Sequence, residues 1–566
     1  MNKKVSHSFN KNIIREYDIR GVYNKTLFDE DAKILGNLFG LKIGEGGIVN
    51  VAYDGRNSSF KLKESLIDGL MEVGTNVNEI GLGPTPMLYY SCAEMNVGSG
   101  IIVTGSHNPK THNGFKIVYN HSPFFGEDLK ILKKKAENFE FKTVKAKKSK
   151  IDIKEKYLSR LIKNFVQKKE INVVWDAGNG SAGELMKKLS NKIKGKKIIL
   201  YDKIDGNFPN HHPDPSESKN LEDCQKFILK NNLDVGLAFD GDGDRLGVVD
   251  DRGRVIPGDK VLLLLAKQML TKKKIKVIAD VKCSQVLFDE INKLGGEIIM
   301  SKTGHSHVKN NLKKFDAHLA GEMSGHIFFS EGYYGFDDAL YSAVKVLEIL
   351  NENKKKLSEL VDEIPNAYNT PEIRIECEDE FKFNVIKIVS ENLRKENKNI
   401  IDIDGVRVLD DDGWWLLRAS NTQPALVVRC ESSSKNGLEK QKKNVLVQLK
   451  KTDYNFDQKI FGWKVDPNFL IYYYNHLAMN DELKNPSSQT LVVSKVKEKK
   501  PKLYKVILLN DDYTPMEYVV KLLREVFRKT ENDAINIMLM VHKKGSGVCG
   551  IFTKEIAETK VFTVTN

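Results

Sequence analysis

The sequence predicts an α/β protein in which one arrangement of strand and loop occurs three times, followed by a smaller fourth unit. Short β-branched runs alternate with segments of helical length, which is the pattern of α/β units. Three of these runs end in glycine-rich polar loops, although sequence identity between the loops is slight. Loops at one edge of a sheet are where α/β proteins place their chemistry. We therefore look for function in those loops.

Size and composition indicate a globular protein of several domains, roughly three to five at ordinary domain sizes. Of the 566 residues, 40% are hydrophobic and 29% charged. We find neither a secretion signal nor an apolar stretch of membrane-spanning length, so we expect a cytoplasmic protein without a membrane partner. The six cysteines lie far apart without a Cys-x-x-Cys pair, which argues against a zinc ribbon or a disulfide framework.

The net charge of +13 favours anionic partners, either nucleic acid or phosphorylated metabolites. The lysine runs at 133–135, 272–274 and 354–356 lie on polar, helix-like stretches without interleaved aromatic residues. We interpret these runs as solvated helix faces, and we expect no nucleic-acid partner.

The first unit contains the loop around which the other motifs are organised. A strand is predicted over 48–53, a helix over 59–73 and a buried strand over 101–103, which ends in the loop Thr104–Pro109. On this loop Ser106 would stand on a stiff turn beside His107, with Lys116 a few residues on, so that its hydroxyl could attack or carry a group. The alternative is a local side-chain turn.

A polar turn is also predicted near the start of the chain, over Tyr17–Gly21. It presents Arg20 as a fork for a phosphate or a carboxylate.

The second unit offers two competing motifs. After a strand over 171–175, Gly178, Gly180 and Gly183 match G-x-G-x-x-G, and Asp202 follows about twenty residues later, as in a dinucleotide site. This pattern supports an NAD-dependent sugar oxidoreductase as the rival function. A second strand, over 235–239, runs into the sequence Asp-Gly-Asp-Gly-Asp-Arg.

That acidic loop predicts a metal site. Asp240, Asp242 and Asp244 alternate with glycines, so their carboxylates can converge on one hard cation. An EF-hand is excluded because its calcium loop needs glycine at the sixth position and glutamate at the twelfth. Here those positions would be Arg245 and Asp251. Solvated loop acids are the plainer alternative.

The third unit has a predicted helix over 261–270, a strand over 276–281 and a turn over 303–305. It then ends in a loop in which glycines bracket Glu322, Ser324 and His326. Such a flexible rim could accept sugar hydroxyls, whereas the alternative is a helix cap with a buried histidine.

The fourth unit follows a hinge that Pro365 and Pro371 suggest. A strand over 414–417 leads into a loop whose guanidinium, hydroxyl and amide groups could hold a phosphate dianion: Arg418, Ser420, Asn421 and Thr422. A simple surface turn is the alternative. Residues 456–500 are interpreted as a linker, and a separate small domain begins with a strand at Leu503 and a helix at Met516.

Five motifs together resemble the α-D-phosphohexomutase superfamily. They are YDIRG, TGSHNP, DGDGDR, GEMSGH and RASNTQP, in this order over residues 10 to about 455. The GEMSGH form and the stretch His211–Pro215 look most like the phosphomannomutase/phosphoglucomutase branch. The resemblance implies three mixed-sheet α/β domains at 1–150, 151–252 and 253–366, and a smaller α+β domain at 367–455, around a central cleft.

The resemblance also implies the chemistry. A phosphoserine would interconvert hexose 1-phosphate and hexose 6-phosphate through a hexose 1,6-bisphosphate, with Mg²⁺, in a monomer or weak dimer. The implied catalytic residues are Arg20, Ser106, His107, Lys116, Arg245 and His326. The implied metal ligands are Ser106, Asp240, Asp242 and Asp244. The implied substrate-binding residues are Tyr17, Lys282, His305, Glu322, Ser324, Arg418, Ser420, Asn421 and Thr422.

The last part, 501–566, resembles the ClpS adaptor family in YKVILLNDDYTPMEYVVKLL, MLMVH and CGIFTKEIAETKV. The resemblance implies binding of N-degrons and of a Clp ATPase, and a protein whose main role is that of an adaptor is a second alternative. The implied N-degron residues are Asn510, Asp511, Thr514, Met516, Met538, Val541 and His542. Family members continue past the point matching Asn566, so we expect an incomplete domain. We also hypothesise that 479–566 derives from a separate reading frame.

Overall fold

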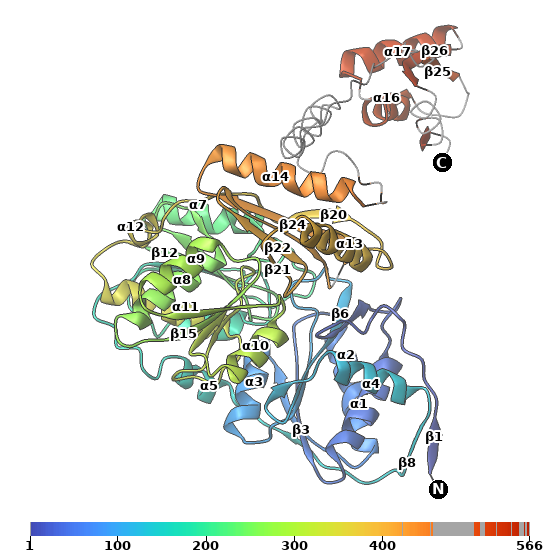
Figure 1. Cartoon of the computed structure of the whole chain (residues 1–566). Coiled ribbons are helices and arrows are strands. Elements are labelled where there is room, and N and C mark those ends of the chain that lie inside the picture. Colours follow the sequence, from blue (N-terminus) through green and yellow to red (C-terminus); the bar gives the residue numbers. More distant parts are fainter. Residues whose placement is uncertain are drawn as a thin grey trace, which may run out of the picture. The chain divides into compact units, whose positions relative to one another are not determined.

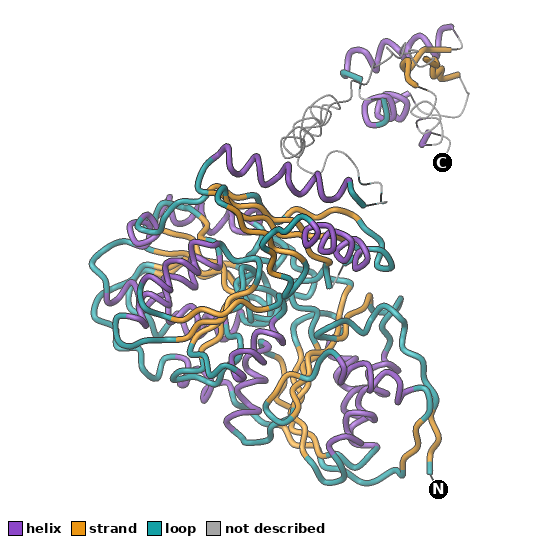
Figure 2. The backbone as a smooth tube through the Cα atoms, in the orientation of Figure 1, coloured by secondary structure: helices purple, strands orange, loops and turns teal. Residues whose placement is uncertain are grey.

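The structure, a computed structural model, describes most of the chain. The described residues are 2–452 without 422, then 454 and 456, and in the last part 503–509, 516–527, 529–544, 546–553, 560, 563 and 564. Two compact units, Met1–Val465 and Asp466–Asn566, divide the chain, and each is described by itself. Figure 1 labels the elements and Figure 2 distinguishes helices from strands. The predicted linker 456–500 lies almost wholly outside the described residues.

The first sheet has the strand order β2-β6-β5-β3-β4-β9, with β7 beside β6, and β1 pairs with β8 in a separate ribbon. Its elements are β1 (Lys3–Val5), β2 (Ile19–Val22), α1 (Asp29–Ile43), β3 (Ile48–Tyr53), α2 (Ser59–Glu72), β4 (Asn76–Leu82), α3 (Thr85–Glu94), β5 (Gly100–Val103), β6 (His112–Tyr119), β7 (Ser122–Pro123), α4 (Glu127–Ala136), β8 (Phe139–Phe141) and β9 (Lys148–Lys150).

The second sheet has the order β11-β10-β12-β13-β14 and the third the order β16-β15-β17-β18. Around the second lie α5 (Lys154–Leu161), β10 (Val173–Asp176), α6 (Gly183–Ser190), β11 (Lys197–Leu200), a 3₁₀ turn (Ser218–Leu221), α7 (Glu222–Asn231), β12 (Val235–Phe239), β13 (Leu246–Asp250) and β14 (Val255–Ile256). Around the third lie α8 (Gly258–Leu270), β15 (Lys276–Asp280), α9 (Gln285–Lys293), β16 (Glu297–Ser301), α10 (His305–Lys314), β17 (Leu319–Gly321), β18 (Ile327–Phe329), α11 (Ala339–Glu352) and α12 (Leu357–Asp362).

Each of these three sheets has a central set of four strands with the same arrangement. The orders β4-β3-β5-β6, β11-β10-β12-β13 and β16-β15-β17-β18 each contain three parallel strands and an antiparallel fourth. In each sheet the loop that the sequence analysis selected joins the last parallel strand to the antiparallel one. The prediction of one arrangement used three times is therefore confirmed, and the arrangement puts the three loops at equivalent places.

One apolar core joins the three sheets. Alternate residues of each central strand point to opposite faces, so Ile101 packs with α1 and α2 while Ile102 faces α3. The α3 face of the first sheet, the α5–α6 face of the second and the α8–α11 face of the third form one continuous cluster, in which Trp175 is fully buried. This shared core fixes the sheets, and hence their loops, relative to one another.

The fourth sheet is smaller, with the order β19-β24-β23-β22-β21 and β20 also on β24. Its elements are β19 (Tyr368–Asn369), β20 (Ile373–Glu376), α13 (Lys382–Lys395), β21 (Ile400–Ile401), β22 (Val406–Asp410), β23 (Gly413–Ala419), β24 (Ala425–Ser432) and α14 (Lys435–Lys450). Helices α13 and α14 cover one face, against Trp415 and its neighbours. On the other face Trp414 and Leu416 pack against Val281 of the third sheet.

Two local predictions were wrong. Ile19–Val22 is an edge strand that pairs with β6, not part of a turn, because buried Ile19 lies opposite Phe115 in that register. His305 starts helix α10 and does not lie in a turn; the helix is preceded by its N-cap residue Gly304, whose φ of 123° suits glycine. The limits predicted for the domains stay a prediction.

The lysine runs were expected on helix faces, and only one of them is. The run at 133–135 lies on α4, whereas 272–274 follows α8 and 354–356 lies between α11 and α12. Their lysines are exposed, Lys133 less so than the others. All six cysteines are free thiols, and most are buried. Among the described residues no helix is both long and apolar enough to cross a bilayer.

In the second unit β25 (Leu503–Leu509) pairs antiparallel with β26 (Ser546–Thr553), and the register shifts after Val506. The helices among the described residues of this unit are α16 (Met516–Glu525) and α17 (Glu531–Lys544). A small core of Val506, Leu523, Phe527, Ala534 and Cys549 joins strands and helices. The described part is thus α+β, as predicted.

Arg407 offers a test of how the fourth sheet is attached. Its buried guanidinium donates to the carbonyl oxygens of Val281 at 2.7 Å and Cys283 at 2.9 Å and stacks on Trp414. Arg407→Gln leaves these buried acceptors without a charged donor, so we expect a loss of about 2 kcal/mol in unfolding free energy. Urea denaturation followed by tryptophan fluorescence measures it. The exposed Arg394→Gln is the control, with an expected change below about 0.5 kcal/mol; equal effects of the two changes would contradict this role.

Candidate active site

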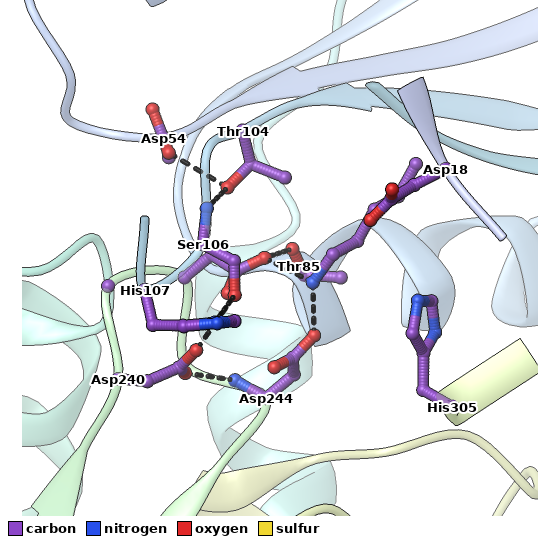
Figure 3. Close-up of polar contacts among 12 residues, drawn as sticks. Asp18, Asp54, Thr85, Thr104, Ser106, His107, Asp240, Asp244 and His305 are labelled. Carbon is purple, nitrogen blue, oxygen red and sulfur yellow. Dashed lines mark hydrogen bonds and ion pairs between the residues drawn. The ribbon is translucent and has the colours of Figure 1, made fainter. Parts of the chain in front are cut away.

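The serine loop connects β5 to β6 and holds Ser106 in a constrained conformation. Ser106 is buried, and its φ of 48° lies in the left-handed region, which is uncommon for serine. Its N–H donates to Oγ1 of Thr104 at 2.8 Å, and that hydroxyl donates to Oδ2 of Asp54 at 2.8 Å (Figure 3). The predicted stiff turn therefore exists, and it fixes the direction of the serine hydroxyl.

Two residues that the sequence analysis missed, Asp54 and Arg56, support this loop. The buried guanidinium of Arg56 donates to the carbonyl oxygens of Ser106, Asn108, Pro109 and His112 at 2.6–3.0 Å. Asp54 also accepts from the N–H of Gly105. The available signal was their position directly after β3, where parallel strands of an α/β sheet carry their functional residues.

The acidic loop lies between β12 and β13, against the serine loop. Asp240, Asp242 and Asp244 are fully buried, and their carboxylate oxygens lie close enough to share one ion. Ser106 Oγ donates to Asp240 Oδ2 at 3.0 Å, while Thr85 Oγ1 donates to Asp242 Oδ2 at 2.5 Å. The solvated-acid alternative is therefore wrong for this loop.

The buried carboxylates of the acidic loop need nearby positive charge to stay ionised. Burial, and then Asp242 and Asp244, raise the pKa of Asp240 well above its usual value. Lys116 from β6 lies 2.6 Å from Asp242 and also pairs with Asp244. Burial alone would lower the pKa of Lys116, but these two carboxylates raise it above the usual value, so the ammonium stays charged.

A divalent cation fits these residues. Asp242 Oδ1 and Asp244 Oδ1 are buried and accept no hydrogen bond from the described residues. Three carboxylates and a hydroxyl form an all-oxygen donor set, which suits Mg²⁺.

Cations and histidines surround the serine and the acids. Arg20 bonds to Asp18 at 2.6 Å and to Asn108 of the serine loop at 3.0 Å. Nδ1 of His107 lies 3.2 Å from Ser106 Oγ. Burial, followed by the charges of Arg245 and Arg20, lowers the pKa of His107 well below its usual value, so its imidazole is neutral. The predicted catalytic residues are thus brought together.

Arg245 links the acidic loop to the third loop. Its Nε donates to Nε2 of His326 at 2.9 Å, and the two residues form an isolated β-bridge. Buried His326 sits at the end of a hairpin loop, not at a helix cap as the alternative had it. On the same loop buried Glu322 accepts from the N–H of Gly304 at 2.5 Å, and Ser324 is half-buried.

Tyr17 and His305 meet between the first and third sheets. Their rings make an edge-on contact with centroids 5.7 Å apart. Burial raises the pKa of Tyr17 to about 12, and burial lowers the pKa of His305 well below its usual value, so both are neutral. They line a cavity of about 500 Å³ together with Lys116.

The fourth loop joins β23 to β24 and faces the third sheet. Arg418 Nε donates to Asp404 Oδ2 at 3.0 Å, and the same oxygen accepts from the N–H of Thr303 at 3.0 Å. Ser420 and Asn421 follow on this loop, while Thr422 lies outside the described residues. Lys282 pairs with Glu372 at 3.1 Å, near the start of the fourth sheet. Arg418, at the end of β23, and Ser420, the first residue of the loop, are both buried, so this loop is more than a surface turn.

The glycines of the dinucleotide-like motif serve packing. A Cβ on Gly180 would lie 2.9–3.0 Å from backbone oxygens of Ala177, Asp240 and Gly241, and one on Gly183 would lie 2.1 Å from the oxygen of Asp202. These glycines therefore allow close packing against the backbone of the acidic loop and of Asp202. This observation argues against the oxidoreductase alternative.

The second unit shows only some of the predicted N-degron residues. Asn510, Asp511 and Thr514 lie outside the described residues. Met516 begins α16 and is exposed; on α17, Met538 is half-buried, Val541 is buried and His542 is exposed.

Comparison with known families accounts for both units. Residues 11–142, 155–253 and 257–368 match the phosphoglucomutase/phosphomannomutase alpha/beta/alpha domains I, II and III, and residues 372–447 match the C-terminal domain of the same family. Residues 499–566 match the ATP-dependent Clp protease adaptor protein ClpS.

Individual relatives agree with these matches. A phosphomannomutase/phosphoglucomutase of Pseudomonas putida is 42% identical over 77% of this chain and 95% of that protein. A phosphoglucomutase of Neisseria gonorrhoeae is 40% identical over 76% of this chain and 95% of that protein. A solved phosphoglucomutase/phosphomannomutase family protein from Burkholderia thailandensis is 38% identical, has a TM-score of 0.73 and covers 79% of this chain and 99% of its own. The chain carries a ClpS domain at its end and belongs to the phosphoglucomutase/phosphomannomutase family.

Proposed function

We propose that the first unit interconverts hexose 1-phosphate and hexose 6-phosphate, with mannose and glucose as the sugars, through a phosphoserine at Ser106. The observation that carries this proposal is the placement of one buried hydroxyl, 3.0 Å from Asp240, inside a cluster of three buried acids. Family membership supports the reaction class. The loop held by Arg56 supports the role of Ser106, because a carrier must present the same oxygen in every turnover.

The transfer step requires alignment and charge neutralisation. The O6 hydroxyl of a hexose 1-phosphate attacks the phosphorus of phosphoserine 106; the O6–P bond forms as the P–Oγ bond breaks. The O6 proton passes to a base of the cluster, for which neutral His107 is our candidate, because Nε2 of His326 already accepts from Arg245. Lys116, Arg20 and Arg245 supply positive charge near the transferred group.

Asp240, Asp242, Asp244 and Ser106 would hold Mg²⁺. When bound, this ion supplies charge that stabilises the leaving oxygen of the serine. Lys116 holds Asp242 and Asp244 in position for it.

The product of the first transfer is a hexose 1,6-bisphosphate. It must turn over in the site so that the 1-phosphate can return to Ser106, and the site must therefore hold a phosphate at either end of the sugar. We assign sugar recognition to Glu322, Ser324, His305, Lys282 and Tyr17. The non-reacting phosphate is assigned to the fourth loop, with Arg418, Ser420, Asn421 and Thr422. The hinge predicted at Pro365 and Pro371 would let the fourth sheet close over the ligand.

Replacing the carrier tests the mutase proposal. Ser106→Ala removes the oxygen that bonds to phosphorus, so we expect a fall in turnover of at least about 10³-fold, in line with the loss of other covalent nucleophiles. Turnover is followed by ³¹P NMR with mannose 1-phosphate, Mg²⁺ and a trace of glucose 1,6-bisphosphate. Ser324→Ala is the matched control, since it should weaken substrate binding but keep transfer measurable. Ser106→Ala turnover within tenfold of the unchanged protein would refute the carrier role.

Removing the metal tests the acidic cluster. We expect chelation with EDTA to lower turnover at least about 100-fold and Mg²⁺ to restore it, because three buried carboxylates repel one another and the transferred phosphoryl group. Far-UV circular dichroism of the chelated protein serves as the control and should be unchanged. Turnover that persists after chelation would contradict a metal role.

We also propose that the ClpS domain binds N-degrons and delivers them to a Clp ATPase. Exposed His542 would accept a hydrogen bond from the free α-amine, while Met538 and Val541 line the pocket for the first side chain. Thioether side chains adapt to varied apolar residues. Family membership of residues 499–566 supports this proposal.

A peptide-capture experiment with the full chain tests the adaptor. A peptide beginning with Phe should be retained, and its acetylated form should not, because acetylation removes the α-ammonium. His542→Ala should reduce retention about tenfold or more, as expected for a lost hydrogen bond to a charged group. Equal retention of the free and acetylated peptides would rule out N-degron recognition.

A further inference from the structure

Beyond the residues assigned above, we propose that Asp337 is a positioning residue: it fixes His326 in the Nδ1–H tautomer, so that Nε2 of His326 accepts from Nε of Arg245 and orients that guanidinium. This inference rests on the proposed function. Asp337 lies between β18 and α11, two residues before α11 begins, and outside every motif noted in the sequence.

The hydrogen-bond chemistry of His326 determines its tautomer. Arginine nitrogens only donate, so Nε2 of His326, at 2.9 Å from Nε of Arg245, must be an acceptor without a proton. The ring proton of the neutral imidazole is then on Nδ1, which makes a close ionic contact with Oδ2 of Asp337 at 3.0 Å and lies 3.5 Å from Oδ1 of Asp244. A carboxylate at this distance favours a proton on Nδ1. The contacts with Asp337 at Nδ1 and with Arg245 at Nε2 thus both favour the Nδ1–H tautomer of His326.

Asp337 is itself held rigidly. It is fully buried, and its Oδ1 lies 2.8 Å from Nζ of Lys309 on α10. Its backbone forms a bridge with Phe328 of β18. Lys309 also lies over the ring of Tyr89, with Nζ 4.2 Å from the ring centroid. Oδ1 therefore pairs with Lys309, while Oδ2 faces Nδ1 of His326 at 3.0 Å and Nδ1 of His305 at 3.9 Å. Rotation of the His326 ring would move Nδ1 away from Oδ2 and Nε2 away from Arg245.

The effect of this arrangement falls on Arg245. With Nε bound to His326, the two terminal nitrogens, Nη1 and Nη2, remain for an anion, and Nη1 is 3.9 Å from Asp214. Two terminal nitrogens form the planar fork that binds a phosphoryl group bidentately. Loss of the acceptor at Nε would let the guanidinium rotate about its last side-chain bonds.

Asp244, His326 and Asp337 could also be considered as ligands of a second metal ion, since their atoms lie close together. Two cationic side chains already contact these residues, however. Lys309 pairs with Asp337, and Arg245 donates to His326. A further divalent ion would have to displace one of them, so the positioning role is favoured.

Substitution kinetics test the inference. Asp337→Asn keeps the size of the side chain and removes its charge, so we expect kcat to fall about 10–100-fold, the range found for supporting residues around other sites. KM should stay within about threefold, because Asp337 does not touch the substrate. Asp338→Asn is the matched control: this neighbouring carboxylate is equally buried, caps α11 and bonds to Tyr157 and Tyr333, without contact to His326. It should leave kcat within about threefold.

Two further measurements separate positioning from a general loss of stability. If Asp337 acts through His326, the double variant Asp337→Asn/His326→Asn should be no slower than His326→Asn alone, within about twofold. In protein labelled with ¹⁵N-histidine, the signals that disappear in His326→Asn should show the Nδ1–H tautomer, and Asp337→Asn should shift them toward Nε2–H. Independent, multiplicative losses or an unchanged tautomer would overturn the inference. If the unchanged protein interconverts no hexose phosphates, the proposed function fails, and the tautomer still decides the role of Asp337.

Discussion

Three carboxylates buried side by side impose the constraint on which the rest of the first unit depends. Asp240, Asp242 and Asp244 are fully removed from water, and each raises the cost of charging the others. The arrangement is stable only where positive charge and donors reach it from outside the loop. Lys116 reaches it from β6 of the first sheet and Thr85 from the start of α3, while backbone N–H groups of Asp244 and Arg245 reach Asp240 from the loop itself. The acids therefore tie the first two sheets together.

The repeated sheet arrangement explains how such contacts are possible. Each of the three sheets turns from its last parallel strand into an antiparallel one, and the turning loop carries the chemistry: a hydroxyl, three acids, then Glu322 and His326. A continuous apolar core contains residues of all three sheets and fixes the sheets relative to one another. The fourth sheet is attached differently, through the buried guanidinium of Arg407 and through Trp414 and Leu416, which pack on Val281.

The sequence was most informative where chemistry is local. Alternating aspartates and glycines predicted the acidic loop, and β-branched runs predicted the strands beneath it, because both signals are complete within a few residues. Residues that act across long separations gave no such signal: Arg56 serves a loop fifty residues away, Thr85 meets Asp242, and Asp337 reaches His326 around a hairpin. The edge strand β2 was missed because its structure depends on pairing with β6. Its few residues show no alternation of polar and apolar side chains that would distinguish a strand from a turn. The glycines at 178–183 led to the opposite kind of error, a predicted cofactor site. Close packing against neighbouring backbone requires glycine at these positions, and a dinucleotide site would require the same spacing.

In the mutase that we propose, one cation and one phosphorylated serine share the acidic cluster. Mn²⁺, which binds oxygen ligands like Mg²⁺, makes this measurable by electron–nuclear double resonance on the protein phosphorylated with glucose 1,6-bisphosphate. The account predicts a ³¹P hyperfine coupling that shows phosphorus within a few ångströms of the bound Mn²⁺ and disappears in Ser106→Ala. Mn²⁺ bound without any ³¹P coupling in protein that carries the phosphate would contradict it.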